Sequence, residues 1–348
     1  MAVGIGTEHI TGGGLAVTAP SSTPGRRRRA LQLPRSPKII AGLAMLAFFL
    51  LLSIIGPLVR PYDPSRIFQN SPVPLPPSAA HWLGTTGLQQ DVFSQLLVGG
   101  GDMLLVSAIA GVIATALSVV IGIAAGFLGG LTDDLLSMLA NIFLVMPALP
   151  LLVILFGFLG KAGSNDLFLV GLIISVTGWA WGARVLRAQT LSLRNRDYVD
   201  SARIIGERKW RIIFTEILPN LTPIVASSFL FTVLYAVGTY TAMAFLGLVN
   251  PNWNWGGMLF YAQNGNAEET GYWWWFIPPG LAIALLGTAL VLLNFGIDEF
   301  INPRLRAAGL TRRSGRGNRA RALRSQQFAL TPVVRAATTG TPGKEGTA

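Results

Sequence analysis

The chain has 348 residues, of which 51% are hydrophobic and only 12% are charged, about half the charged share of a soluble domain. The formal net charge is +11, and the mean hydropathy is +0.52. The absence of cysteine excludes disulfides, thiol nucleophiles and cysteine-ligated metals, and two histidines, His9 and His81, are too few for a histidine-rich metal site. This composition predicts a multispanning membrane protein.

The hydrophobic residues occur in long blocks. Residues 1–37 are rich in Gly, Thr, Ser and Pro and contain the run Arg26–Arg29, a composition that predicts a disordered basic tail. Basic residues precede the stretch Ile39–Val59, as in a signal peptide. Its 21 residues, with no small-residue cleavage site after them, favour a retained first span. Further spans are expected at about 102–128, 134–159, 166–188, 217–248 and 275–300.

Lysine and arginine are distributed unevenly between the two sides that six spans define. They concentrate in the N-terminal tail, in the segment 184–211 and in the tail after Asn302; the exceptions among the 27 are Arg60, Arg66 and Lys161. Because basic loops stay in the cytoplasm, this bias predicts that both termini and the connection between spans four and five are cytoplasmic. The basic excess is then a topology signal, so we expect no nucleic-acid binding.

That connection is the most informative segment, and it reads RNRDYVDSARIIGERKWRIIFTEILPN from Arg194 to Asn220. Its apolar residues are spaced three to five apart, as on an amphipathic helix. Gly206 interrupts the pattern, and since Gly costs about 1 kcal/mol relative to Ala inside a helix, we expect a turn there between two short helices. The pattern fits a helix on the membrane surface or one presented to a groove of a soluble partner. The apolar residues are Val199, Ala202, Ile205, Trp210 and Ile213.

The spacing around Gly206 favours the second interpretation. Asp200, Ser201 and Ala202 precede Gly206, and Leu218–Pro219 follows, which resembles the E-A-A…G…L-P loop of ABC importer permeases with Asp and Ser replacing Glu and Ala. In that family the loop couples the permease to its ATPase subunits. The resemblance therefore implies that residues 194–216, the coupling segment, contact an ATPase. The residues that it assigns to coupling are Asp200, Ser201, Ala202, Gly206, Glu207 and Arg208.

The resemblance extends over residues 38–306 and is similar in detail to the oligopeptide and dipeptide subfamily, the C-type permeases. The motif H-x-L-G-T-D-x-x-G-R-D-V-x-S-R before the second span is matched by residues 81–95, where Thr86, Gln90 and Gln95 replace an aspartate and two arginines. The motifs W-G-x-M-L and P-P-G-L-A-I also recur, at residues 255–259 and 278–283. The departures and the ending of the last span resemble family members associated with uptake of oligosaccharides such as cello-oligosaccharides.

The resemblance implies an all-α membrane protein with the type I ABC importer permease fold, six transmembrane helices, cytoplasmic N- and C-termini, a permease domain over 38–306 and basic tails over 1–37 and 307–348. It implies a subunit, not an enzyme, of a bacterial plasma-membrane importer of oligopeptides or short oligosaccharides. Its partners would be a second permease, two ABC ATPases, an extracytoplasmic substrate-binding protein and the lipid bilayer. The chain lacks a G-x-x-x-x-G-K-[ST] loop, so we expect ATP and Mg²⁺ on the ATPases and no cofactor here.

The translocation pathway is harder to assign. Asn141 in the third span and Tyr235, Tyr240 and Met243 in the fifth are candidates, since tyrosine and asparagine suit either sugars or peptide groups. Ordinary packing within the bundle is the competing interpretation. A self-sufficient secondary transporter is the alternative function, although the sequence shows neither an internal repeat nor acidic residues in the middle of a span.

Overall fold

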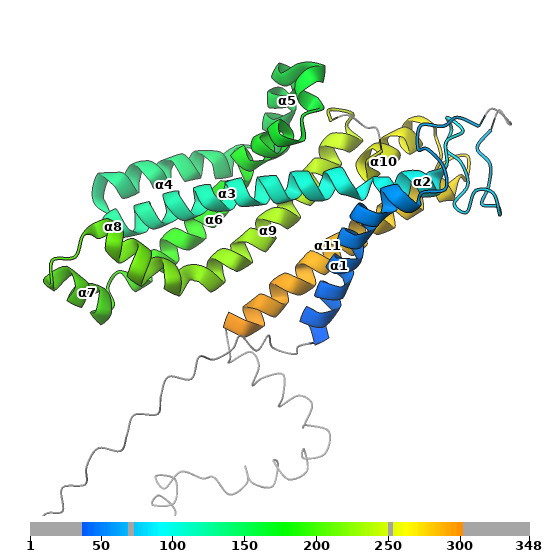
Figure 1. Ribbon diagram of the computed structural model, residues 1–348. Coiled ribbons are helices and arrows are strands. Elements are labelled where there is room, and N and C mark those ends of the chain that lie inside the picture. Colours follow the sequence, from blue (N-terminus) through cyan, green and yellow to red (C-terminus); the bar gives the residue numbers. More distant parts are fainter. Residues whose placement is uncertain (1–36, 69–72, 250–252, 302–348) are drawn as a thin grey trace, which may run out of the picture. The chain divides into compact units, whose positions relative to one another are not determined.

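A computed structural model describes residues 37–68, 73–249 and 253–301, all of which belong to the unit Arg35–Ala348. The predicted tails 1–37 and 307–348 lie outside the described residues except for Pro37, where the first helix begins. In the described ranges all the regular elements are helices (Figure 1). Extended backbone pairs there at an isolated bridge between Thr85 and Asp91. The all-α prediction is confirmed.

Five helical stretches are long and apolar enough to cross a membrane, and each overlaps a predicted span. They are α1 (Pro37–Val59), α2 (Val92–Val98) with α3 (Gly100–Leu128), α6 (Leu167–Leu193), α8 (Lys209–Ile212) with η1 (Ile213–Ile217) and α9 (Leu218–Phe245), and α11 (Trp273–Ile301). Two shorter helices lie in the connections between them, α7 (Asp197–Ile204) and α10 (Trp255–Asn264).

The sequence predicts a third span over about residues 134–159, with prolines inside it, and here the structure shows two helices. α4 (Gly130–Val145) and α5 (Ala148–Ser164) are bent by 90° where they meet at Met146 and Pro147. A proline pushes the residue before it into extended backbone, and Met146 has ψ 127° while Pro147 itself has ψ 114°. The helix therefore stops and restarts. The pair counts as one broken span or as a re-entrant loop, so the described residues contain five or six spans.

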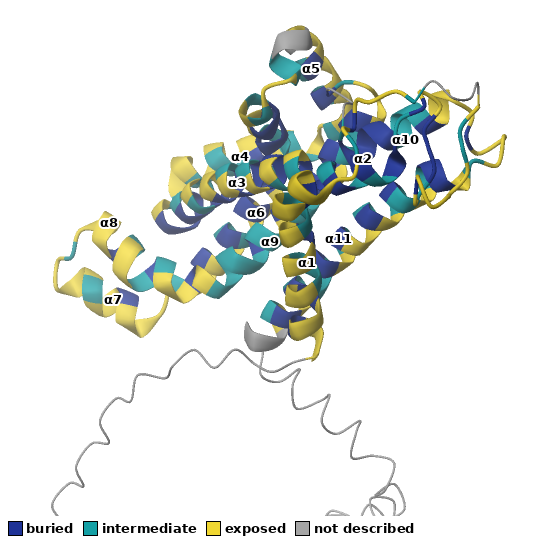
Figure 2. Cartoon of the chain, turned by 45° about the vertical axis from the view of Figure 1, so that its right-hand side comes forward, coloured by how far each residue is buried: buried dark blue, intermediate teal, exposed yellow. Residues whose placement is uncertain are grey.

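α3 and α6 pack closely along their length because small residues let the two backbones approach. A Cβ added to Gly122 would lie 2.5 Å from the carbonyl oxygen of Ala183, and one added to Gly126 would lie 2.8 Å from that of Arg187. α9 packs against both helices, and α1 packs against α11. Figure 2 shows the buried residues along the facing sides of these helices. The small residues of α3 therefore set how closely α3 and α6 approach each other.

The two ends of this bundle carry different structures. α7 and α8 lie at one end, which we call the α7/α8 end, and α2 and α10 lie at the other, the α2/α10 end (Figure 1). α9 runs between them from Leu218 to Phe245, so the ends are separated by about the length of a membrane span. At the α2/α10 end, the indole Nε1 of Trp255 donates a hydrogen bond to the carbonyl oxygen of Leu96 (2.9 Å), which ties α10 to α2.

Candidate functional site

Gly206 ends the first short helix of the coupling segment. α7 stops at Ile204, and Gly206 has φ +87°, a conformation that glycine adopts without strain. The N–H of Gly206 donates to the carbonyl oxygen of Arg203 (3.0 Å), and the N–H of Glu207 donates to that of Ala202 (3.1 Å). These two hydrogen bonds form a Schellman motif, which satisfies carbonyls at the helix end. The turn predicted at Gly206 is therefore present as a helix C-cap.

Buried side chains fasten the coupling segment to the spans. Val199 on α7 and Ile212 on α8 are at most 2% exposed. They lie in one apolar cluster with Ile123 and Phe127 of α3 and Leu186 of α6. In addition, α8 continues through the π-helical turn η1 directly into α9. The segment is therefore held by the ends of three spans and not by its own short helices alone.

Four other side chains of the same segment are large, apolar and exposed. Ile204 is 86%, Ile205 80%, Trp210 58% and Phe214 61% exposed. We call these four residues the coupling ridge; they lie at the α7/α8 end, where Figure 2 shows largely exposed surface. Burying apolar surface is worth about 25 cal/mol for each Å², so this exposure has a cost that a partner would remove. Such surfaces are typical of protein or membrane interaction sites.

The charged candidates of the coupling segment form short-range ion pairs. Asp200 Oδ1 lies 3.0 Å from Arg203 Nη1, and Glu207 Oε2 lies 3.2 Å from Arg211 Nη1. Pairs of this kind at a surface contribute little to stability, typically 0–1 kcal/mol, so they can be exchanged at low cost for pairs with a partner. All six candidates lie in one turn and its flanks: Asp200, Ser201, Gly206 and Arg208 are exposed, and Ala202 and Glu207 are half-buried.

The structure separates the pathway candidates by burial. Tyr240 and Met243 are at most 1% exposed and belong to the main apolar core. In this arrangement neither side chain reaches the surface of the chain, so both pack within the subunit. Tyr235, also on α9, is half-buried, and its hydroxyl lies 2.9 Å from Oγ1 of Thr177 on α6. Of the three α9 candidates, Tyr235 is the one with a polar group near the surface.

Asn141 lies in a different place, in a polar cluster between α4 and α6. Its Oδ1 accepts a hydrogen bond from Nη2 of Arg184 (2.6 Å). Arg187, one turn further along α6, holds Asp133 through two hydrogen bonds, one of them from Nη2 to Oδ2 at 2.8 Å. Ser137 Oγ donates to Oδ1 of Asp133 (2.9 Å). The structure therefore brings Asn141 together with arginines and not with the tyrosines of α9.

An aromatic stack between α6 and α9 is absent from the sequence-based candidates. The rings of Trp181 and Phe231 lie 4.4 Å apart, with an interplanar angle of 30°, and they are 45% and 39% exposed. The stack lies one turn along each helix from the Thr177–Tyr235 pair. Together the four residues form a partly exposed face of aromatic rings and hydroxyls within the spans. Each helix is apolar on several sides, so periodicity alone could not select this face.

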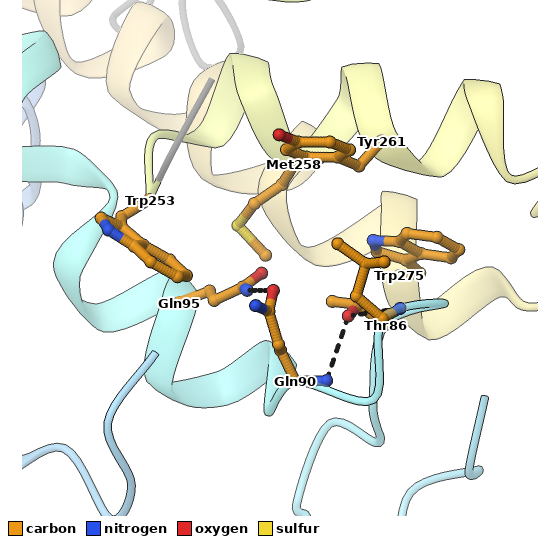
Figure 3. A pocket seen from close by; sticks show the side chains of 8 residues that line it. Thr86, Gln90, Gln95, Trp253, Met258, Tyr261 and Trp275 are labelled. Carbon is orange, nitrogen blue, oxygen red and sulfur yellow. Dashed lines mark hydrogen bonds between the residues drawn. The ribbon is translucent and has the colours of Figure 1, made fainter. Parts of the chain in front are cut away.

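Gln90 and Gln95, the two replacements of arginine in the segment before the second span, meet in a small pocket at the α2/α10 end (Figure 3). Gln95 Nε2 donates to Oε1 of Gln90 (2.7 Å), and the backbone N–H of Gln90 donates to Oγ1 of Thr86 (3.2 Å). The indole Nε1 of Trp275 is buried with no hydrogen-bond partner among the described residues. The pocket also includes Leu88, Trp253, Met258 and Tyr261, so its lining is uncharged.

Comparison with known proteins shows which family this chain resembles. Residues 118–307, more than half of the chain, match the family of binding-protein-dependent transport system inner membrane components. The chain belongs to this family. The matched range includes the coupling segment, about the last third of α3 and the spans that follow it.

This permease also resembles curated permeases over most of its length. It is 31% identical to the dipeptide transport system permease protein of Bacillus subtilis over 281 residues, which cover 79% of this chain and 84% of the relative. It is 30% identical to the probable D,D-dipeptide transport system permease protein of Escherichia coli, over 78% of this chain and 89% of that protein. Identity to the oligopeptide transport system permease protein of Mycobacterium tuberculosis is 30%, over 80% and 96%.

These comparisons confirm the predicted class of protein. The chain is the permease subunit of a binding-protein-dependent importer and a multi-pass protein of the bacterial plasma membrane, with a transport role and not a catalytic one. The alternative of a self-sufficient secondary transporter finds no support in the family or in these relatives. The relatives are named for peptides, so the oligosaccharide branch stays a prediction.

Proposed function

We propose that this permease forms half of the translocation pathway of an ATP-driven importer of peptides. The other half is a second, homologous permease, and two ABC ATPases bind at the α7/α8 end, which faces the cytoplasm with both termini. An extracytoplasmic binding protein delivers substrate at the α2/α10 end. The ATPases hold ATP and Mg²⁺, and this chain needs no cofactor.

The observation that carries this proposal is the coupling ridge, Ile204, Ile205, Trp210 and Phe214. A membrane-surface helix would also expose apolar side chains. The ridge, however, is on a segment that the Schellman turn and the buried Val199 and Ile212 hold in one conformation. A preformed apolar ridge flanked by exchangeable charges is suited to a groove on a protein partner, because it orders little on binding.

In this mechanism the coupling segment moves as a unit with the spans. When the ATPases close around ATP, the groove that holds the ridge moves, and α7 and α8 move with it. The cluster around Val199 and Ile212 transmits that displacement to α3, α6 and α9. Rigid-body motion of this kind alternates access between the two sides of the membrane. Asp200, Glu207 and Arg208 supply charges at the rim of the contact, and Gly206 fixes the angle of the turn.

We further propose that substrate passes the face formed by Thr177, Trp181, Phe231 and Tyr235. This face supplies hydroxyls and partly exposed rings, which suit peptide groups of varied sequence. Tyr240 and Met243 support it from the core. Peptides are the proposed substrates because the relatives are named for them. An oligosaccharide would use the same rings and hydroxyls. Uptake of a labelled cello-oligosaccharide should therefore be measured together with uptake of a labelled dipeptide.

The decisive experiment exchanges one ridge residue for a charge. Ile205→Glu replaces a side chain that is 80% exposed with a carboxylate, so the substitution should not disturb folding. We expect the variant to insert in the membrane in normal amounts but to lose copurification of the ATPase subunits in mild detergent, together with uptake. The matched control is Trp82→Glu, because Trp82 is 65% exposed and lies in the outer segment before α2; it should keep the ATPases.

Full copurification and uptake with Ile205→Glu would contradict the assignment of the ridge. Transport by the purified permease alone, without ATP, would contradict the importer itself and return the secondary transporter as the function.

A further inference from the structure

The polar cluster around Asn141 borders a pocket that neither the coupling segment nor the proposed pathway uses. The pocket lies between α3, α4 and α6 and has a volume of about 100 Å³. Its floor is apolar because small residues, among them Ala125, Ala140 and Ala183, leave room between the helices. Its rim is polar and includes Asn141 and Arg184. A ligand that fits this pocket must therefore have both a polar and an apolar part.

The charges at the rim are not balanced. Arg187 is neutralised by Asp133 through two hydrogen bonds. Arg184, by contrast, donates to the neutral amide of Asn141, and no carboxylate in the described ranges forms an ion pair with it. Arg184 is also exposed, so its remaining donors are accessible. A guanidinium presents donors in a fork that matches the oxygens of a phosphate.

The position of Arg184 along α6 matches the depth of lipid headgroups. α6 begins after Asp166, and residues Leu167–Ala183 contain no ionisable side chain. At a rise of 1.5 Å per residue, Arg184 lies about 27 Å from Asp166, close to the roughly 30 Å thickness of the hydrocarbon layer. Two other charges face the same region: Arg194 donates to the carbonyl of Gly126 at the end of α3, and Asp134 lies two turns before Asn141 on α4.

We propose that this pocket binds the phosphate of an anionic phospholipid. Arg184 holds the phosphate, the side-chain amide N–H of Asn141 donates a hydrogen bond to it, and an acyl chain follows α4. That course is apolar: beyond Asn141, α4 exposes Ile142 and Val145, and Val145 is 85% exposed. A free phosphate would share the arginine but gain nothing from the apolar floor. The site does not depend on ATP coupling or on the choice of substrate.

Native mass spectrometry of the purified full chain in detergent tests the proposal, with phosphatidylglycerol and phosphatidylcholine as probes. We expect phosphatidylglycerol to be retained in preference. Arg184→Gln should lower that retention about fivefold, the factor that corresponds to about 1 kcal/mol for each arginine at an anionic membrane surface. Asn141→Asp should do the same, because a carboxylate of the same size would neutralise Arg184 internally. Arg203→Gln is the control, since Arg203 lies at the same end but is paired with Asp200.

Three results would overturn the proposal. The first is retention of phosphatidylglycerol by Arg184→Gln and Asn141→Asp at the level of the unchanged chain. The second is displacement of the lipid by an equal concentration of inorganic phosphate, which would assign the pocket to a soluble anion. The third is unchanged lipid retention by Arg184→Gln together with a loss of dipeptide uptake by the same variant, which would assign Arg184 to substrate binding. Asn141→Asp keeps the volume of the side chain, so it tests the site even if Arg184→Gln folds poorly.

Discussion

His81 Nδ1 lies 2.9 Å from Asp91 Oδ1, and both side chains are buried at the start of α2. The other carboxylate oxygen of Asp91 accepts hydrogen bonds from the N–H and the hydroxyl of Ser94, both at 2.7 Å. One carboxylate therefore caps α2 and fixes the histidine ring. His81 in turn packs edge-on against Phe68, at 4.7 Å between ring centroids. Asp91 thus joins the segment before α2 to the bundle.

Removing that carboxylate should loosen the segment before α2. Asp91→Ala leaves the buried partners His81 and Ser94 unsatisfied, which costs about 1–3 kcal/mol for each buried group. We expect trypsin to cleave after Arg66 several-fold faster in this variant than in the unchanged chain. Asp63→Ala is the control because Asp63 is exposed and its hydrogen bonds are to Ser65. Equal cleavage rates for both variants would contradict the role of Asp91.

Two substitutions of Gly206 should affect uptake differently, because one residue tolerates its positive φ and the other does not. A Cβ at this position meets no atom within 4 Å, but φ is +87°, which costs a typical L-residue about 1–2 kcal/mol. Asparagine tolerates this conformation, so Gly206→Asn should keep most uptake. Gly206→Glu adds strain and a second carboxylate beside Glu207, and it should abolish uptake with membrane insertion intact. Uptake of a labelled dipeptide by Gly206→Glu at the level of the unchanged chain would remove Gly206 from coupling.

Two glycines within spans should respond oppositely to the same change. Gly122→Ala places a Cβ 2.5 Å from the backbone oxygen of Ala183, so α3 and α6 must separate, at a cost of about 1–3 kcal/mol. Gly238 on α9 has nothing within 4 Å of an added Cβ, and Gly238→Ala should stabilise by up to about 1 kcal/mol. Thermal unfolding of the two purified variants in one detergent checks both directions. A lower Tm for Gly238→Ala than for Gly122→Ala would contradict the packing.

The pathway proposal predicts different defects at Trp181 and Tyr240. Trp181→Ala removes half of a partly exposed stack, so folded protein should accumulate normally while KM for uptake rises several-fold. Tyr240→Ala leaves a cavity in the core, which costs about 3–5 kcal/mol, so the yield of folded protein should fall with KM unchanged in what survives. Yield and uptake kinetics are measured on the same membranes. An unchanged KM in Trp181→Ala would remove the aromatic face from the pathway.

The features that sequence could predict are those set by local chemistry. The turn at Gly206 is one, because a helix C-cap depends on one left-handed residue and two hydrogen bonds close in sequence. The spans are another, since each is a continuous apolar block. Pro147 marks a departure from a straight helix, but its sequence context does not give the 90° angle, because α4 packs on α3 and α6 while α5 packs on α6.

The features that sequence could not predict are those made by pairs of helices. Tyr235 and Tyr240 lie on the same apolar helix, and the packing of several other helices around α9 decides that Tyr235 is half-buried and Tyr240 lies in the core. The hydrogen bond between Arg184 and Asn141 joins residues 43 positions apart, and neither residue alone signals a partner. Burial of the anchors Val199 and Ile212, against exposure of Ile205 and Trp210, likewise depends on three spans that end at the same place.

The unbroken passage from α8 through η1 into α9 gives the permease a single rod of 37 residues, Lys209–Phe245. At 1.5 Å per residue it is about 55 Å long, enough to cross the bilayer with a turn or more to spare on one side. A load applied near Trp210 would reach α9 along this one helix, through the π-helical turn η1. It would pass to the other spans where α9 contacts α3 and α6.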